Sequence, residues 1–132
     1  MNISKKVIRG VAIFDLVATL GMTLPGLSGL WLGMFRHLHV SLGLSGNFPS
    51  FAPGNELFVN IGGTLVFFFS LIRIRTPTRF PTLCDCGARI LVASLILFYT
   101  FGAGMSRVFL PFVVTELGGL LLNLWALRDV RD

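Results

Sequence analysis

The sequence is poor in charged residues. Only 13% of its 132 residues are Asp, Glu, Lys or Arg, whereas ordinary soluble domains contain about 25%. Apolar residues make up 54% of the chain, and its mean hydropathy is +0.81. A soluble domain of this size has too little interior to bury so much apolar surface. The composition therefore argues against a soluble domain and predicts an integral membrane protein whose apolar side chains face the lipid bilayer.

Histidine and cysteine are also scarce, which argues against a metal, haem or redox centre. The histidines are His37 and His39, and the cysteines are Cys84 and Cys86. Residues two apart point to different sides of a helix, so the histidines are poorly placed to share a metal ion. A disulfide across one intervening residue is strained, and a zinc site needs further ligands. We predict no metal site, no resident cofactor and two reduced thiols.

Signatures of familiar catalytic and nucleotide-binding sites are missing as well. The sequence contains no Gly-x-Ser-x-Gly elbow, no phosphate-binding loop and no dinucleotide fingerprint. The net charge of +5 could favour nucleic acid. However, the basic residues stand at the ends of apolar segments rather than in one patch, so we expect no nucleic-acid binding. An enzyme is the least favoured class.

Four apolar segments divide the chain, at 7–24, 56–74, 88–103 and 108–127. The first follows Lys5 and Lys6, as a signal peptide would, but no small-x-small cleavage site follows it and Asp15 interrupts it. A basic, proline-containing loop is expected between the second and third segments. The sequence thus predicts a single all-α domain, a bundle of four transmembrane helices.

An additional helix is predicted over 27–42, because its apolar residues recur with the period of a helix. One straight helix over 7–42 would be about 54 Å long at 1.5 Å per residue, whereas the hydrocarbon core is about 30 Å thick. Pro25 and Gly26 are expected to break it. The amphipathic segment is then expected to lie along the outer interface or to lean back over the bundle.

The basic residues predict the orientation in the membrane. Cytoplasmic ends of membrane helices are rich in Lys and Arg. An arrangement with both termini in the cytoplasm leaves only Arg36 and Arg107 outside. The basic residues that it places inside are Lys5, Lys6, Arg9, Arg73, Arg75, Arg79, Arg89, Arg128 and Arg131.

Two carboxylates, Asp15 and Glu116, fall near the middle of predicted spans. A charged acid at that depth costs roughly 2.5–3.5 kcal/mol on insertion scales. Such residues face the bundle interior and find partners there, or they stay protonated. Two interpretations remain open: a hydrogen-bonding staple between helices, or a functional site.

Helical spacing places further polar residues on the same faces as these acids, so that one small polar cavity is expected. Arg89 either bends inward to an acid or extends to the lipid headgroups, and Asp85 is expected to cap the third helix. The glycine pairs Gly62-Gly63 and Gly118-Gly119 predict close helix approach rather than room for a ligand. The candidate ligand-binding residues are Asp15, Thr19, Asn60, Thr64, Arg89, Tyr99, Glu116 and Asn123.

The order of FDLVATLGMTLPGL, NELFVNIGGTLVFFFSLIRIRTP, CDCGARILVASLILFYTFG and FVVTELGGLLLNLW resembles the DoxX-like group of small four-helix bacterial membrane proteins. Within that group it is most similar to the BphX-like family, found beside aromatic-degradation genes. The resemblance implies a multi-pass protein of the bacterial inner membrane. The wider group includes a subunit of a thiosulfate:quinone oxidoreductase and members linked to redox stress, but it defines no catalytic residues that match here.

Three functions compete on this basis. The first is an accessory or scaffold subunit, with a membrane-protein partner or further copies of the chain. The second is a binder or carrier of a small apolar or weakly acidic molecule, such as an aromatic compound or a quinone, in a bundle rich in Phe. The third is an enzyme acting on a lipid-soluble substrate, with a buried acid and Tyr99 as acid–base groups.

Overall fold

A computed structural model of the chain describes residues 2–130. The fold in this range is helical. Helix α4 continues into one π-helical turn, η1, and a short 3-10 helix, η2, leads into α5. The elements are α1 (Ile3–Leu20), α2 (Leu27–Ser41), α3 (Pro53–Arg75), α4 (Arg79–Leu97), η1 (Phe98–Gly102), η2 (Arg107–Phe109) and α5 (Leu110–Ala126).

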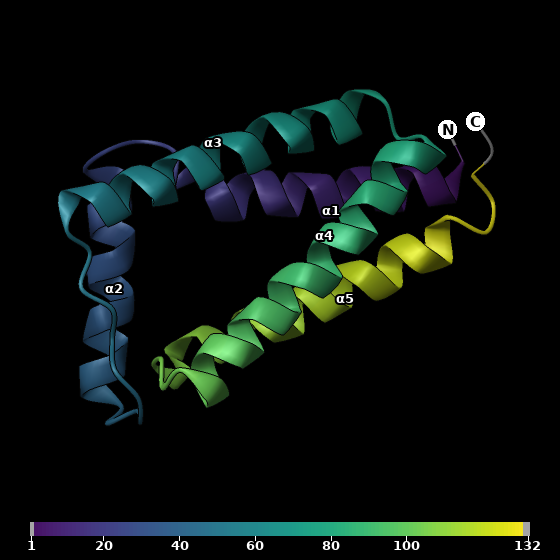
Figure 1. The fold of residues 1–132 in the computed structure, drawn as a ribbon. Coiled ribbons are helices and arrows are strands. Elements are labelled where there is room, and N and C mark those ends of the chain that lie inside the picture. Colours follow the sequence, from purple (N-terminus) through teal and green to yellow (C-terminus); the bar gives the residue numbers. More distant parts are fainter. Residues whose placement is uncertain (1, 131–132) are drawn as a thin grey trace.

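The long helices form two antiparallel pairs, α1 with α3 and α4 with α5 (Figure 1). The pairs come together at the end where α1 begins and α5 ends, and they diverge toward the other end. Helix α1 also packs against α5, whereas α3 and α4 have little contact with each other. The bundle is therefore closed along α1 and α5 and more open between α3 and α4.

Three helical segments have the length and apolar composition to cross a membrane. They are Pro53–Arg75, Arg79–Gly102 and Arg107–Ala126, with mean hydropathies of 1.9, 1.6 and 1.7. These segments indicate a membrane protein. Helix α1, which overlaps the predicted span 7–24, is not among them, because its 18 residues include Lys5, Lys6, Arg9 and Asp15.

The predicted basic loop between the second and third spans is wrong. Helix α3 extends to Arg75 and α4 begins at Arg79, so only 76–78 separate them. Pro77 falls in this short break, whereas Pro81 lies in the first turn of α4, where a missing N–H disturbs no intrahelical hydrogen bond. Asp85 therefore lies inside α4 and does not cap a helix, which corrects the prediction made from the sequence.

Helix α2 agrees with the segment predicted over 27–42 and runs across one end of α1 and α3 (Figure 1). The turn before it needs Gly26, whose φ of 82° is a conformation that other residues rarely adopt. Gly21, at the end of α1, lies directly against the ring of Trp31. The missing side chain at Gly21 thus lets α2 pack against the end of α1.

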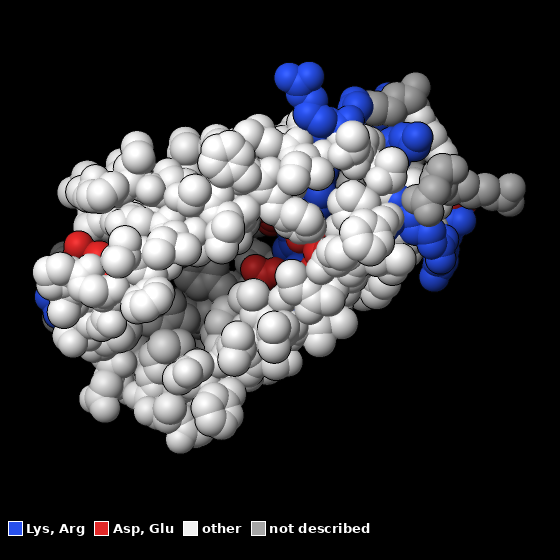
Figure 2. Space-filling model, turned by 45° about the horizontal axis from the view of Figure 1, so that its top comes forward, with Lys and Arg blue, Asp and Glu red and all other residues white. Residues whose placement is uncertain are grey.

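The charged residues are concentrated at the two ends of the molecule. Figure 2 shows Lys and Arg side chains at the end where α1 begins and α5 ends, and a smaller group of charges at the opposite end. Between them the surface is almost entirely uncharged, and large apolar side chains such as Phe58 and Val114 are more than half exposed. An exposed apolar surface of this extent fits a lipid environment.

Candidate functional site

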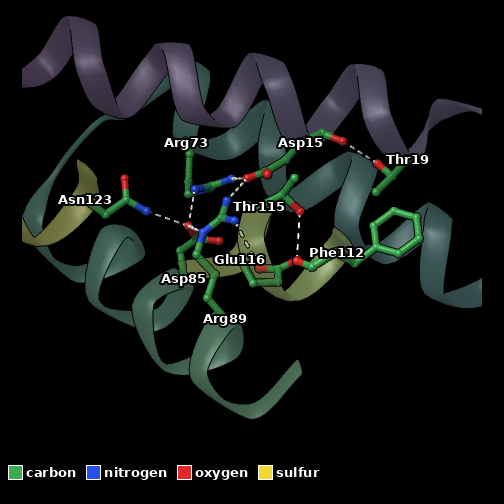
Figure 3. A network of polar contacts seen from close by, with 9 residues as sticks. All are labelled: Asp15, Thr19, Arg73, Asp85, Arg89, Phe112, Thr115, Glu116 and Asn123. Atoms are coloured by element: carbon green, nitrogen blue, oxygen red, sulfur yellow. Dashed lines mark hydrogen bonds and ion pairs between the residues drawn. The ribbon is translucent and has the colours of Figure 1, made fainter. Parts of the chain in front are cut away.

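Five charged side chains from four helices meet inside the bundle (Figure 3). The two arginines at the centre are almost completely buried, with 1% of the Arg73 side chain and 4% of the Arg89 side chain exposed. We call these five residues the ion-pair network. It consists of Asp15 from α1, Arg73 from α3, Asp85 and Arg89 from α4, and Glu116 from α5.

Arg89 is the hub of the network because it contacts all three carboxylates. Its Nε donates to Asp85 Oδ2 at 2.8 Å, and its Nη1 donates to Glu116 Oε2 at 3.0 Å. Its Nη2 donates to Asp15 Oδ2, which also accepts from Arg73 Nη2. Arg73 Nη1 donates in turn to Asp85 Oδ2. The network therefore joins α1, α3, α4 and α5 through charge-assisted hydrogen bonds.

Local sequence explains how Arg89 reaches this position. Asp85 and Arg89 are four residues apart on α4, so they share a face, with the acid N-terminal to the base as such pairs prefer. On the facing helix α5, Gly119 packs directly against the guanidinium of Arg89. Because Gly119 has no side chain, Arg89 can lie across α5 and bond to Glu116, one turn earlier.

Asn123 extends the network toward the end of α5. Its Nδ2 donates to Asp85 Oδ2 at 2.6 Å, and the residue is fully buried. Two buried atoms beside these bonds, Arg73 Nε and Asn123 Oδ1, have no hydrogen-bond partner among the described residues. Buried polar atoms are normally satisfied by protein or ordered water, so this part of the network has unused capacity for hydrogen bonds.

The network contains more acid than base. Three carboxylates face two guanidiniums, which leaves one negative charge when all five groups are ionised. Each carboxylate accepts its hydrogen bonds through one oxygen only. Within residues 2–130 no hydrogen bond reaches the other oxygens, which are Asp15 Oδ1, Asp85 Oδ1 and Glu116 Oε1. The network therefore offers spare acceptors but few free donors.

Two of the acids are accessible from outside the bundle. Figure 2 shows a hollow in one face of the molecule, with charged atoms of both signs inside it. The side chains of Asp15 and Glu116 are 12% and 23% exposed, whereas Asp85 and both arginines are more deeply buried. Asp15 and Glu116 are therefore the least covered of the five network residues.

Four of the eight candidate residues from the sequence come together in this site. They are Asp15, Arg89, Glu116 and Asn123. Of the two orientations left open for Arg89, the structure shows the inward one. Thr19 lies beside the network, but its hydroxyl donates to the carbonyl of Asp15 at 2.8 Å and not to a network side chain.

The other three candidates lie elsewhere. Asn60 and Thr64 line a shallow pocket of about 240 Å³ with Ile61 and Leu65. Tyr99 lies in η1, is 50% exposed and packs edge-on against Phe98. The pairing of a buried acid with Tyr99, on which the enzyme hypothesis depended, is therefore not found among the described residues.

Sequence reasoning missed Arg73 and Asp85. Arg73 was placed at the end of the predicted span 56–74, and Asp85 was placed between the basic, proline-containing loop and the third helix, as its cap. The spacing of Asp85 and Arg89, four residues apart, was the available signal, because it is the spacing of an ion pair on one helix face. Arg73 had no such local signal, since its partners come from α1 and α4.

In each of the two glycine pairs, one residue packs against another part of the protein and the other faces outward. Gly63 packs against Met22 at the end of α1, and Gly119 packs against Arg89. Close approach is thus confirmed for one member of each pair. A side chain at Gly62 or Gly118 would meet no atom within 4 Å, so these two face outward.

The two histidines have different hydrogen-bond partners, and the two cysteines differ in burial. His39 Nδ1 forms a hydrogen bond of 2.7 Å with Ser106 Oγ, whereas His37 lies near Ser41 on α2 itself. Both cysteines are free thiols, and only Cys86 is buried. Across residues 2–130 no group of three or more His, Cys, Asp and Glu side chains is arranged to hold a metal ion.

Comparison with known proteins gives no match to this chain among protein-family models, curated proteins or solved structures. Arguments about its function therefore depend on its own residues and geometry. The resemblance to the DoxX-like group stays a prediction.

Proposed function

We propose that the protein crosses the membrane four times and binds a small apolar molecule with a hydroxyl or similar hydrogen-bond donor at the ion-pair network. One observation carries the proposal. Spare carboxylate oxygens lie in a network with one surplus negative charge, and two of the acids, Asp15 and Glu116, are partly exposed. The accessible part of the site therefore suits a molecule that donates hydrogen bonds.

The network also supports α1 as the fourth span. Asp15 bonds to Arg73 of α3 and Arg89 of α4, so α1 shares the depth of two apolar helices. Asp15 lies about 18 Å along α1 from Ile3, at 1.5 Å per residue. The basic residues of α1 precede it and lie near the interface, and the charge of Asp15 itself is compensated by two guanidiniums.

The charges at the ends of the bundle support cytoplasmic termini. Arg73 and Arg89 belong to the ion-pair network, so they are not counted as basic residues at the membrane interface. Arg131 lies outside the described residues. The basic residues left at this end still outnumber Arg36 and Arg107 at the other, as expected for a cytoplasmic face. They are Lys5, Lys6, Arg9, Arg75, Arg79 and Arg128.

The ligand is inferred from the chemistry of its site. A carboxylate oxygen without a donor is costly where water is excluded. A phenol-like hydroxyl provides the donor, and the apolar body of the same molecule fits the surrounding lipid and helices. Weakly acidic aromatic compounds and reduced quinones both have this combination. The resemblance to the DoxX-like group, which includes a subunit of a thiosulfate:quinone oxidoreductase, points in the same direction.

Native mass spectrometry of the protein, extracted gently from its own membranes, tests the proposal. We expect a bound small molecule, and we expect Glu116→Gln to lower its affinity about tenfold or more, because one charge-assisted hydrogen bond is lost. This variant keeps an oxygen that can accept from Arg89, so the bundle is expected to fold. Glu56→Gln makes the same change outside the network and is the control.

The proposal fails if no small molecule is retained, or if Glu116→Gln, Asp15→Asn and the control bind it as the parent does. The network would then act only as a staple between helices.

A second candidate function is that of an accessory or scaffold subunit. It is favoured by Gly62 and Gly118, which face outward with open space beyond them. Small residues at such positions let the backbone of a neighbouring helix approach closely in the membrane. We expect Gly118→Leu to reduce co-purification of a partner or the population of an oligomer. Gly10→Leu, at another helical glycine with open space around it, should leave the assembly unchanged.

A further inference from the structure

A second pocket lies at the end of the molecule opposite the basic end. It has a volume of about 410 Å³ and is enclosed by α2, the segment 48–52 and the first turn of α3. None of its lining residues belongs to the ion-pair network. The two sites can therefore be altered independently.

Two opposite charges line this pocket without pairing. Arg36 comes from α2 and is exposed, and Glu56 comes from the first turn of α3 and is half-buried. Among residues 2–130 neither side chain takes part in an ion pair. The guanidinium of Arg36 lies instead over the ring of Phe48, 5.8 Å from its centroid. Both charges are thus free to bind complementary groups of a ligand.

Apart from Ser50, the rest of the pocket wall is apolar, and it leaves space. Phe48 and Phe51 pack edge-to-face with their centroids 6.0 Å apart. On α2, Gly29 and Gly33 are one turn apart, and a side chain at either position would meet no atom within 4 Å. The glycines therefore leave room for a group that lies along α2.

The position of the pocket indicates the origin of such a ligand. Helix α2 runs across the ends of α1 and α3 (Figure 1), beside the first turn of an apolar span. In a membrane this is the level of the lipid headgroups. The charged groups at that level are the phosphate and amine of phospholipids.

We infer that this pocket binds the headgroup of a zwitterionic phospholipid with a primary amine, the phosphate on Arg36 and the ammonium on Glu56. A guanidinium suits phosphate because it presents several donors in one plane. A carboxylate accepts the hydrogen bonds of an ammonium group. Phe48 and Phe51 contact the apolar part next to the headgroup.

Titration of the purified protein with lipids of identical acyl chains, followed by native mass spectrometry, tests this inference. The parent is expected to bind phosphatidylethanolamine more tightly than phosphatidylglycerol, which has a phosphate but no amine. Arg36→Gln should weaken the binding of both lipids about tenfold, whereas Glu56→Gln should weaken only phosphatidylethanolamine by that factor. Arg107→Gln, an exposed arginine outside the pocket, should change neither.

Filling the pocket gives a second, independent measurement. Gly33→Leu places a side chain in the open space and should abolish the preference for phosphatidylethanolamine, whereas Gly10→Leu should retain it. The inference is overturned if the parent binds both lipids equally, or if Glu56→Gln affects them alike. Equally tight binding of soluble glycerophosphoethanolamine would also overturn it, because the lipid source would then be wrong.

Discussion

Arg89 connects α4 to α1 and α5 through its carboxylate partners. Four helices contribute to the ion-pair network, and Arg89 contacts all three of its acids directly. Removing one partner from a buried ion pair typically costs 3–5 kcal/mol, because it leaves an uncompensated charge, whereas an intact pair contributes far less net stability. The network is therefore better understood as fixing which helices meet, and at which depth, than as a large source of stability.

Substitution of Gly119 is predicted to destabilise the protein, because this residue makes room for Arg89. A methyl group there would overlap the guanidinium of Arg89, which is held by three carboxylates and cannot move aside without losing them. We expect Gly119→Ala to lower the free energy of unfolding by roughly 1–3 kcal/mol, the cost of overpacking. Thermal or denaturant unfolding in detergent measures this.

Gly118→Ala is the matched control for that substitution. Gly118 is the adjacent residue on the same helix, but its side chain would meet open space. Alanine favours a helix over glycine by about 1 kcal/mol, so this variant should be neutral or slightly more stable. Equal destabilisation by both substitutions would show that the packing of Gly119 against Arg89 is not the cause.

The helices were predictable from the sequence because each has a strong local signal. Apolar composition predicted α3, α5 and the second half of α4, and the helical period of the apolar residues predicted α2. The start of α4 was missed because the basic segment with Pro77 and Pro81 was interpreted as a loop. Proline is favoured in the first turn of a helix and disfavoured in its interior. Which of these applies to Pro81 depends on where the helix begins.

The candidate site was predictable only in part, for a related reason. The need of buried acids for partners identified Asp15 and Glu116 and suggested Arg89. It could not identify Arg73, because the contact between Arg73 and Asp15 depends on how α1 and α3 pack. Asn60 and Thr64 share a helix face, but that face does not join the network. Helical periodicity shows which residues share a face of one helix. Which other helix packs against that face depends on the tertiary structure.

The junction of α1 and α2 offers a prediction at the level of elements. Gly21 lies directly against the ring of Trp31, so Gly21→Ala should displace α2 from the end of α1. Trp31 reports this displacement through its fluorescence, measured in a Trp125→Phe background. We expect a shift in the emission and a lower unfolding temperature.

Gly29→Ala is the control at this junction, because Gly29 lies on α2 but its side chain would meet no other atom. It should leave the emission unchanged. Unaltered Trp31 emission in Gly21→Ala would contradict the proposed packing of α2 on α1.

At the scale of the whole molecule, the number of spans decides where the termini lie. Helix α1 begins and α5 ends at the same end of the bundle (Figure 1). With four spans, both termini face the same side of the membrane. With α1 outside the membrane and only α3, α4 and α5 spanning, the chain enters α3 on one side and leaves α5 on the other. With four spans the N-terminal residues and the segment 43–52 lie on opposite sides of the membrane, whereas with three spans they lie on the same side.

We predict that both termini face the cytoplasm and that the segment 43–52 faces the opposite side. The physical reason is the network, because Asp15 can pair with Arg73 and Arg89 only if α1 lies at their depth. Ser45→Cys, made in a background without Cys84 and Cys86, should react in intact cells with a maleimide that cannot cross the membrane. A reporter that is active only in the cytoplasm should be active when it is fused to either terminus. If Ser45→Cys and the N-terminal reporter lie on the same side, α1 does not span, and the pairing of Asp15 with both arginines cannot form in the membrane.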